Sequence, residues 1–494
     1  RCGMSEERKK EMKMKRIFLP LLAALLLGGC TAAPAPQTTT TTNFDAEVDY
    51  LIVGGGAAGI ASAVEAADQG IEKIMIVEKT GMLGGAAVYS GGIFGGVETE
   101  ITKALDLHVD IEEVIAEQQR EKHYILNDEL TRLTIESAGK TIDWMIGTLG
   151  VQFQPEVIVK DGYGTLQTIH LVEGEGSGLR EPFEKAIADR SIEVRNNTKA
   201  TSLITENGKV IGAECVDENG KTIRIKAKAT LLATGGYSAN TELMASAAEP
   251  NRYFQTSNLS YQTGDGLVMA SAIGAGVQNL DQIQVYLREV ENSTSQFPYM
   301  FTIFVGQDGR RFMDEKRTAQ TWNQEIKDDV VELYGRTGVD YFWSLADEAS
   351  LQMMQIADAA KDHEGIVVAD TLDELAQKTG MDAEALKATV DRWNSFAAKM
   401  EDEDYNRTAQ FWFPISTGPF YALKTTFFSS VCHGGITKNA NAQATRIDGS
   451  VIEGLYAAGE VTTVTNSNGY TISNAITFGR IAAQHAASQI QSAN

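Results

Sequence analysis

Residues 54–59 read Gly-Gly-Gly-Ala-Ala-Gly, and Gly54, Gly56 and Gly59 form a GxGxxG pattern. The first glycine of such a pattern allows a tight turn, the second lets the backbone approach a pyrophosphate, and the third lets a helix pack closely on the preceding strand. Glu78 follows about 20 residues later, the usual distance for an acid that binds a ribose diol. Because the N-terminus of a helix stabilises phosphate, these residues predict a dinucleotide-binding site.

The elements that must position this site follow in the required order. Residues 50–53, Tyr-Leu-Ile-Val, predict a buried parallel strand. An alanine-rich helix should follow the glycines and end near Gly70. A second strand over residues 74–77 leads directly to Glu78. This order predicts an α/β domain with the nucleotide on its first β–α turn, and it leaves both NAD and FAD open.

Three later segments favour FAD. Residues 231–236, LLATGG, predict a strand that enters a turn containing Gly235. Residues 454–460 predict another strand, which ends at Glu460, and residues 471–488 predict a helix. The chain should therefore return to the nucleotide domain at its end, and a domain built from two segments suits the longer cofactor.

Composition argues against several other functions. The formal net charge is −23, and an acidic surface gains nothing from the counterion release that drives nucleic-acid binding. The four cysteines are Cys2, Cys30, Cys215 and Cys432, and no pair has CxxC spacing. Since HExxH is also absent from the sequence, we expect no metal site and no c-type haem.

The first 44 residues read as a targeting segment. Basic residues precede an apolar run over residues 17–27, which is too short to span a bilayer, and the sequence LLGGC ends at Cys30. This resembles a bacterial lipoprotein signal, so we expect a signal peptide over residues 1–29, a lipidated Cys30 and a Pro/Thr-rich tether over residues 30–44. The protein should lie outside the cytoplasmic membrane, attached to the cell surface through this lipid anchor alone. The alternative is a plain signal peptide and a secreted or periplasmic protein.

The remaining markers resemble the flavoprotein family that includes soluble fumarate reductases, urocanate reductases and 3-oxosteroid 1-dehydrogenases. The markers, in order, are VGGGAAGIAS, GGAAVYSGG, ATGGY, YQTGDGLVMA, DGRRFMDE, GLYAAGEV and NAITFGRIAA. The resemblance implies an α/β fold with a Rossmann-like FAD-binding domain in two segments, residues 45–284 and 433–494. An α+β capping domain, residues 285–432, should be inserted between them, with helices around residues 351–360 and 386–400.

The resemblance also implies how FAD is held. Some relatives carry covalent FAD on a histidine where residues 84–87 of this chain read Gly-Gly-Ala-Ala, so binding here should be non-covalent. The N-terminus of the last helix should face the flavin, where it favours the negative charge of the reduced ring. The residues expected to bind the cofactor are Gly54, Gly56, Ala58, Gly59, Glu78, Ala86, Ser90, Gly91, Gly92, Ala200, Gly235, Glu460, Thr471 and Ile472.

The catalytic pattern of the fumarate reductases is incomplete. Their proton-donating arginine should fall near position 319, which is Ala319 here with Arg317 two residues earlier, and their carboxylate-binding arginine near Asn466. We therefore expect a substrate less anionic than fumarate. The candidates for the proton donor are Arg317, Tyr286 and His433, with Tyr470 and His170 as weaker ones. Arg310 and Arg311, beside Asp314 and Glu315, are interpreted as a salt-bridged turn.

These features predict an FAD-dependent reductase of an activated C=C bond in a small-molecule alkene, with hydride transfer from flavin N5 and protonation by a cap residue. One alternative is a dehydrogenase of a ketosteroid-like substrate, and another is an anchored FAD-binding redox carrier without turnover. The sequence contains neither a second dinucleotide fingerprint nor a CxxCH haem motif. We therefore expect a monomer that takes electrons from a separate membrane or extracellular donor.

Overall fold

The computed structural model describes residues 43–160, 166–256, 259–290, 302–318, 321–407, 412–466 and 469–492. Residues from Phe44 onward form one compact unit, and the description below concerns that unit. The expected signal peptide, the tether up to residue 42 and Cys30 lie outside the described residues, as does Ala319.

The first sheet has the nucleotide-binding topology expected from the sequence. Its main path runs β19-β20-β9-β1-β2-β6, and the neighbours from β20 to β6 are parallel. The hairpin of β7 and β8 joins it through β9. Because β20 pairs directly with β9, the C-terminal segment returns to the sheet, as predicted. The strands are β1 (Ala46–Val53), β2 (Ile74–Val77), β6 (Glu193–Arg195), β7 (Lys199–Glu206), β8 (Lys209–Val216), β9 (Thr222–Leu232), β19 (Gln443–Thr445) and β20 (Val451–Ala457).

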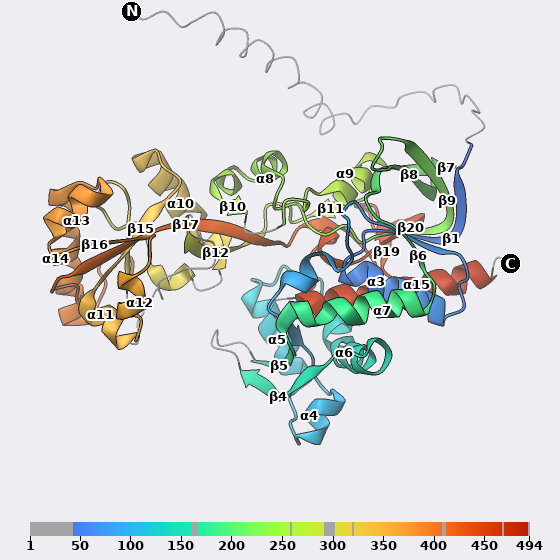
Figure 1. The fold of residues 1–494 in the computed structure, drawn as a ribbon, viewed down its shortest axis with the longest axis horizontal. Coiled ribbons are helices and arrows are strands. Elements are labelled where there is room, and N and C mark those ends of the chain that lie inside the picture. Colours follow the sequence, from blue (N-terminus) through green and yellow to red (C-terminus); the bar gives the residue numbers. More distant parts are fainter. Residues whose placement is uncertain are drawn as a thin grey trace, which may run out of the picture. The chain divides into compact units, whose positions relative to one another are not determined.

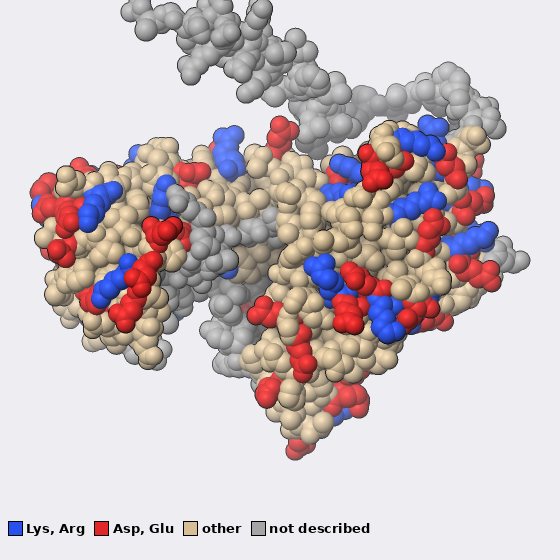
Figure 2. Space-filling view, in the orientation of Figure 1, with Lys and Arg blue, Asp and Glu red and all other residues tan. Residues whose placement is uncertain are grey.

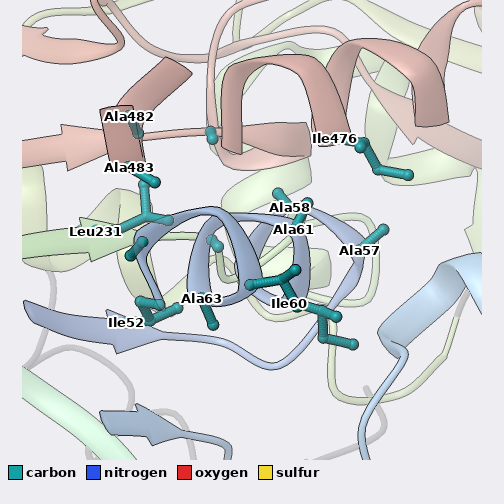
Figure 3. Packing of buried hydrophobic residues seen from close by; sticks show 14 of the residues in the cluster. Ile52, Ala57, Ala58, Ile60, Ala61, Ala63, Leu231, Ile476, Ala482 and Ala483 are labelled. Atoms are coloured by element: carbon teal, nitrogen blue, oxygen red, sulfur yellow. The ribbon is translucent and has the colours of Figure 1, made fainter. Parts of the chain in front are cut away.

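Two helices lie side by side against one face of this sheet, α3 (Ala57–Asp68) and α15 (Thr471–Ser492) (Figures 1 and 3). Small side chains such as Ala58 and Ala61 fill the space between them, so the two helices approach closely. Strand β1 alternates in the way a buried strand must: Ile52 packs into this layer, and Leu51 packs into the core on the other face. The helix α3 ends with Gly70 in a left-handed conformation, as predicted.

A second sheet contains most of the strands from the region expected to form the cap. Its main path runs β13-β15-β17-β12-β14, with β10 and β16 also paired to β17. The sheet also includes β10 and the start of β12, which precede residue 285, because β17 pairs with both strands. The strands are β10 (Gln255–Thr256), β12 (Ile283–Glu289), β13 (Ile303–Val305), β14 (Thr321–Trp322), β15 (Phe342–Asp347), β16 (Ile366–Ala369) and β17 (Phe420–Cys432).

The helices of this region differ in one place from the prediction. The segment around residues 351–360 forms two short helices rather than one, because Gln355 has a φ of 59° and interrupts the helix between them. The expected helix over residues 386–400 is present as α14. The helices are α10 (Asn323–Thr337), α11 (Glu348–Met353), α12 (Ala357–Lys361), α13 (Leu372–Thr379) and α14 (Ala383–Lys399).

A three-stranded sheet, β3-β5-β4, and a strand pair, β11 with β18, complete the sheets of the described residues. These strands are β3 (Ile93–Gly95), β4 (Phe153–Lys160), β5 (Leu166–Val172), β11 (Val277–Gln278) and β18 (Gly435–Ile436). The other α-helices are α4 (Glu100–Ala104), α5 (Ile111–Glu121), α6 (Asp128–Trp144), α7 (Arg180–Asp189), α8 (Thr241–Ala247) and α9 (Asp265–Ala272).

A buried ion-pair cluster fixes the turn at residues 308–311. Arg311 lies 2.7 Å from both Glu315 and Asp402, and Arg407 lies 3.0 Å from Glu315. Burial opposes ionisation of Glu315, but the two guanidinium groups outweigh it and lower the pKa of this carboxyl. The interpretation of Arg311 as a structural residue is therefore confirmed, with Asp402 as a partner that the sequence did not indicate.

The surface drawn in Figure 2 carries acidic and basic side chains interspersed, unlike the continuous basic stripe of a nucleic-acid-binding face. In the residues that the structure describes, no helix is both long and apolar enough to cross a bilayer. The same residues contain no group of three or more His, Cys, Asp or Glu side chains arranged to hold a metal ion. Cys215 and Cys432 are buried free thiols.

Candidate active site

One cavity of about 690 Å³ connects the two large sheets. Its walls come from the β1–α3 turn, the segment after β2, the start of α15 and the second-sheet strands β12 and β17. The cavity therefore has a dinucleotide side and a second-sheet side. The predicted cofactor residues that line it are Gly54, Gly56, Ala58, Glu78, Ala86, Ser90, Gly91, Ala200, Gly235, Glu460, Thr471 and Ile472.

Two glycines of the β1–α3 turn have different roles: Gly59 allows close packing, and Gly56 faces the cavity. Gly59 does not line the cavity: a Cβ there would lie 2.0 Å from the Gly54 carbonyl oxygen, so the close contact of helix and turn requires glycine. At Gly56 a Cβ would meet its nearest protein atom, on Gly85, only at 4.0 Å. The space beside Gly56 therefore belongs to the cavity, as the close approach of a pyrophosphate needs.

The first turn of α3 supplies donors for phosphate. Ala57 and Ala58 line the cavity, and no side chain caps this helix. The first N–H groups of a helix have no partner within the helix, and they carry partial positive charge. An uncapped helix start in a cavity wall is therefore suited to an anionic group.

Glu78 closes the turn from the other side. Its Oε2 accepts a hydrogen bond from the Gly55 N–H at 2.7 Å, and its Oε1 accepts one from the Thr80 N–H at 2.8 Å. These two bonds fix the carboxylate at the end of β2, beside the glycine turn. Each oxygen retains a further lone pair, which a ribose hydroxyl can use.

A 3₁₀ helix, Gly85–Tyr89, forms the next part of the wall. The hydroxyl of Ser90 donates to the Ala87 carbonyl at 2.7 Å, which fixes the segment that presents Ser90 and Gly91 to the cavity. Gly92 is not part of the lining. Its backbone packs against Glu175, where a Cβ would lie 2.6 Å from a carbonyl carbon, so this glycine serves the fold.

Glu460 and the start of α15 form the wall near the second sheet. Oε1 of Glu460 accepts a hydrogen bond from the Cys432 N–H at 2.9 Å. Burial raises the pKa of this carboxyl to about 7, and the hydrogen bonds from Cys432 and Gly236 oppose that rise. Thr471 and Ile472 begin α15 and lie in the same wall, so the positive end of a long helix points at this part of the cavity.

Sequence reasoning missed a charged cluster near Glu78. Nζ of Lys79 lies 2.8 Å from Asp265, and Nζ of Lys199 lies 3.0 Å from the other oxygen of the same carboxylate. All three residues line the cavity. Burial alone would raise the pKa of Asp265, but the two lysines lower it. Asp265 lies in the YQTGDGLVMA motif, and the motif alone does not indicate that two lysines distant in the chain meet this carboxylate.

The second-sheet side was only partly foreseen. Tyr286 lines the cavity as predicted, together with Gln284 and Arg288 of the same strand, β12. Strand residues two apart share a face, so the sequence IQVYLRE contained the signal that could have found Arg288: polar residues alternate with apolar ones. Ser430 and Val431, at the end of β17, extend this wall.

The structure does not bring Arg317 to the cavity. Its guanidinium donates to the Glu325 carbonyl at 2.9 Å and forms an ion pair with Asp329 at 2.7 Å. These contacts hold the side chain at the start of α10, and the residue is absent from the described lining. In this arrangement Arg317 forms structural contacts and does not reach the cavity where a proton donor would act.

His433 is also set back from the described lining. It is buried, and its Nε2 lies 3.4 Å from Nζ of Lys122. Burial, with the Lys122 charge as the smaller cause, lowers the pKa of this imidazole well below its usual value. A neutral imidazole is a weak proton donor. The weaker candidates His170 and Tyr470 are both fully buried and also lie outside the described lining.

The residues present fit FAD. The cavity offers open space beside Gly56, uncapped N–H groups at α3, a fixed carboxylate at Glu78 and a second helix start at Thr471. These groups match a pyrophosphate, a ribose diol and a ring that becomes anionic on reduction.

Comparison with known proteins agrees with this geometry. The family model described as FAD binding domain matches residues 49–475. Urocanate reductase of Eggerthella lenta is 28% identical over 472 residues, which cover 92% of this chain and 76% of that protein. NADH:fumarate oxidoreductase of Klebsiella pneumoniae is 28% identical over 453 residues, which cover 89% of this chain and 47% of that protein. This chain thus spans about half the length of the second relative.

A solved structure shows the same fold. The open conformation of a flavocytochrome c3 fumarate reductase matches with a TM-score of 0.78 and 24% identity, over 99% of this chain and 82% of that chain. The family match over most of the sequence, with the reductase relatives, identifies FAD as the cofactor, and the chain belongs to the FAD binding domain family.

Proposed function

We propose that this protein is an FAD-dependent reductase of an activated C=C bond. The observation that supports this most strongly is the shared cavity, in which the dinucleotide residues and Tyr286 of the second sheet line one continuous space. A substrate held against β12 would therefore lie beside the flavin end of the cofactor. Pockets between two parts of a protein are a common place for such sites.

When bound and reduced, FAD would supply the hydride for the alkene. The chain's own residues then have three tasks. The start of α15 stabilises negative charge at its end of the cavity, β12 and β17 exclude water, and Tyr286 donates a proton to the carbon next to the activating group. Tyr286 takes this role because it is the one of the three main candidates in the described cavity wall.

We propose an α,β-unsaturated acid or ketone as the substrate class. The two relatives are named for the reduction of fumarate and urocanate, both of which contain a C=C bond beside a carboxylate. By the resemblance to fumarate reductases, their two arginines should fall near Ala319 and Asn466 of this chain, which favours a substrate with less negative charge than fumarate.

Single-turnover mixing tests this proposal. The purified protein is photoreduced without oxygen and mixed with a panel of enoates, enones and their saturated analogues, while flavin absorbance is followed. The proposal expects rapid reoxidation by at least one unsaturated compound and by no saturated one. A dehydrogenase would instead be reduced by a ketosteroid and pass electrons to a dye, and a carrier without turnover would respond to neither set.

We also propose that the protein is exported and attached to the membrane through Cys30, as a monomer that receives electrons from a separate donor. The LLGGC sequence supports the anchor, and the single dinucleotide fingerprint supports the separate donor. Labelling with a fatty acid should be lost in C30A, whose product should leave the membrane fraction, and light scattering should give the mass of one chain. Rapid flavin reduction by NADH would contradict a separate donor.

A further inference from the structure

Strand β12 presents a row of three side chains to the cavity. Gln284, Tyr286 and Arg288 line it, and Val285 and Leu287, between them, pack into the core of the second sheet. Since a strand rises about 3.3 Å per residue, the row places its groups roughly 7 Å apart along one wall. This row therefore offers an amide, a phenol and a guanidinium in a fixed order.

The described cavity wall contains basic side chains on both its dinucleotide side and its second-sheet side. Lys79 and Lys199 lie on the dinucleotide side, and both form ion pairs with Asp265. Arg288 is the cation of the described wall that belongs to the second sheet. Within the described part of the wall, the second-sheet side therefore presents one positive charge.

Two of the contacts of the Arg288 guanidinium involve its neighbours on β12. Its Nη1 donates to the Leu287 carbonyl at 2.8 Å, and its Cζ lies 5.3 Å from the centre of the Tyr286 ring. A guanidinium over an aromatic face is attracted by the ring and remains fully charged. Its planar set of five N–H donors can bind a carboxylate through two parallel hydrogen bonds.

We propose that Arg288 binds the carboxylate of the substrate and makes the enzyme selective for alkenes that carry one negative charge. This inference rests on the proposed reductase function and assigns its anion-binding residue. An anion on Arg288 would lie beside Tyr286, the residue proposed to donate the proton. One guanidinium matches one carboxylate, so a dicarboxylate would leave its second charge without a cation on this wall.

The test compares R288Q and R288K with R310Q in the flavin-loaded protein. Arg310 is exposed in the turn at residues 308–311 and lies outside the cavity lining, so R310Q removes the same charge elsewhere. The first measurement is the change in flavin absorbance on titrating the oxidised protein with cinnamate, with cinnamamide and with fumarate. The second is the rate at which cinnamate and cinnamamide reoxidise the photoreduced protein.

We expect wild type and R310Q to bind cinnamate at least 10-fold more tightly than cinnamamide or fumarate. In R288Q the affinity for cinnamate should fall about 10- to 100-fold, the range for loss of a charge-assisted hydrogen-bonded pair, and that for cinnamamide less than twofold. R288K should fall between the two, because an ammonium keeps the charge but not the planar donors.

Three results would each overturn the assignment of Arg288. They are an equal loss of cinnamate and cinnamamide binding in R288Q, an unchanged preference of R288Q for cinnamate over cinnamamide, and tighter binding of fumarate than of cinnamate by the wild type. Arg288-dependent binding without reoxidation by either compound would uphold Arg288 as the anion site and count against the reductase proposal. The two ideas can therefore fail separately.

Discussion

The backbone N–H of Cys432 donates a hydrogen bond of 2.9 Å to Oε1 of Glu460, which joins the end of the second-sheet strand β17 to the acid after β20 in the first sheet. This bond crosses from one sheet to the other at the wall of the cavity. The protonation of Glu460 is therefore linked both to the stability of the fold and to the environment of the cofactor.

The first prediction follows from the pKa of Glu460, which burial raises from 4.5 to about 7. Between these values the folded protein binds more protons than the unfolded chain, so the stability that neutral Glu460 contributes is complete below about pH 4.5 and declines as pH rises to 7. Relative to E460Q, the free energy of unfolding of the wild type should fall by roughly 2–3 kcal/mol over this range. Urea titrations of both proteins at several pH values measure the difference, and a pH-independent difference contradicts it.

The second prediction separates cofactor binding from folding at the glycine turn. The Cβ added in G56A would meet its nearest neighbour in the described residues, the Cα of Gly85, at 4.0 Å, so the unfolding temperature should change little. The same Cβ fills the space predicted for the pyrophosphate, so FAD affinity, measured by quenching of flavin fluorescence, should fall about 10-fold or more.

The matched variant is G59A. Its Cβ would lie 2.0 Å from the Gly54 carbonyl oxygen, so the turn must move and the protein should lose several kcal/mol of stability, as expected for overpacking at a constrained site. If G59A is as stable as the wild type, or if G56A binds FAD normally, the roles assigned to these glycines are incorrect.

The third prediction concerns the buried cluster in the second sheet region. Glu315 is fully buried between Arg311 and Arg407, so E315Q leaves buried guanidinium charge without its partner. We expect a loss of about 3–5 kcal/mol in unfolding free energy, compared with less than about 0.5 kcal/mol for the exposed R310Q. The free energy of unfolding of the wild type should also decline at acidic pH. The fold lowers the pKa of Glu315, so the stability that its carboxylate contributes is lost when acid protonates it. Equal stability of the two variants would show that the cluster contributes nothing.

The fourth prediction tests the phenol of Tyr286. Y286F keeps the ring beneath Arg288 but removes the hydroxyl, so substrate and FAD binding should persist and the rate of substrate reduction should fall about 100-fold or more. Y253F, which removes a hydroxyl bonded to Glu249 outside the described cavity wall, is the control. A wild-type rate and pH profile in Y286F would exclude the phenol as the donor.

The dinucleotide half of this account was predictable from local sequence. The order of strand, turn, helix, strand and acid from Tyr50 to Glu78 depends on residues close together in the chain, and the structure places each as expected. Gly59 and Gly92 show the limit of that reasoning: the first was assigned a packing role and a cofactor contact at once, and the second packs against Glu175. A sequence motif does not distinguish a glycine that faces a ligand from one that faces the backbone.

The second-sheet side was harder to predict because its residues come together through distant pairing. Arg288 and Ser430 reach one wall only because β12 pairs with β17, far along the chain. Counting positions from DGRRFMDE leads to Ala319, and Arg317, the arginine near that position, has surroundings that depend on Asp329 of α10. The second sheet likewise begins in the sequence at residue 255, because β10 pairs with β17. No local sequence signal near residue 255 indicates this pairing.

The most direct test of the reductase proposal is product analysis after one turnover. Photoreduced protein is mixed without oxygen with the best oxidant from the unsaturated panel, and the saturated product is counted against flavin reoxidised. The proposal predicts one saturated molecule for each flavin, formed as the absorbance returns. Flavin reoxidation without saturated product, or no reoxidation by any enoate or enone, would contradict it.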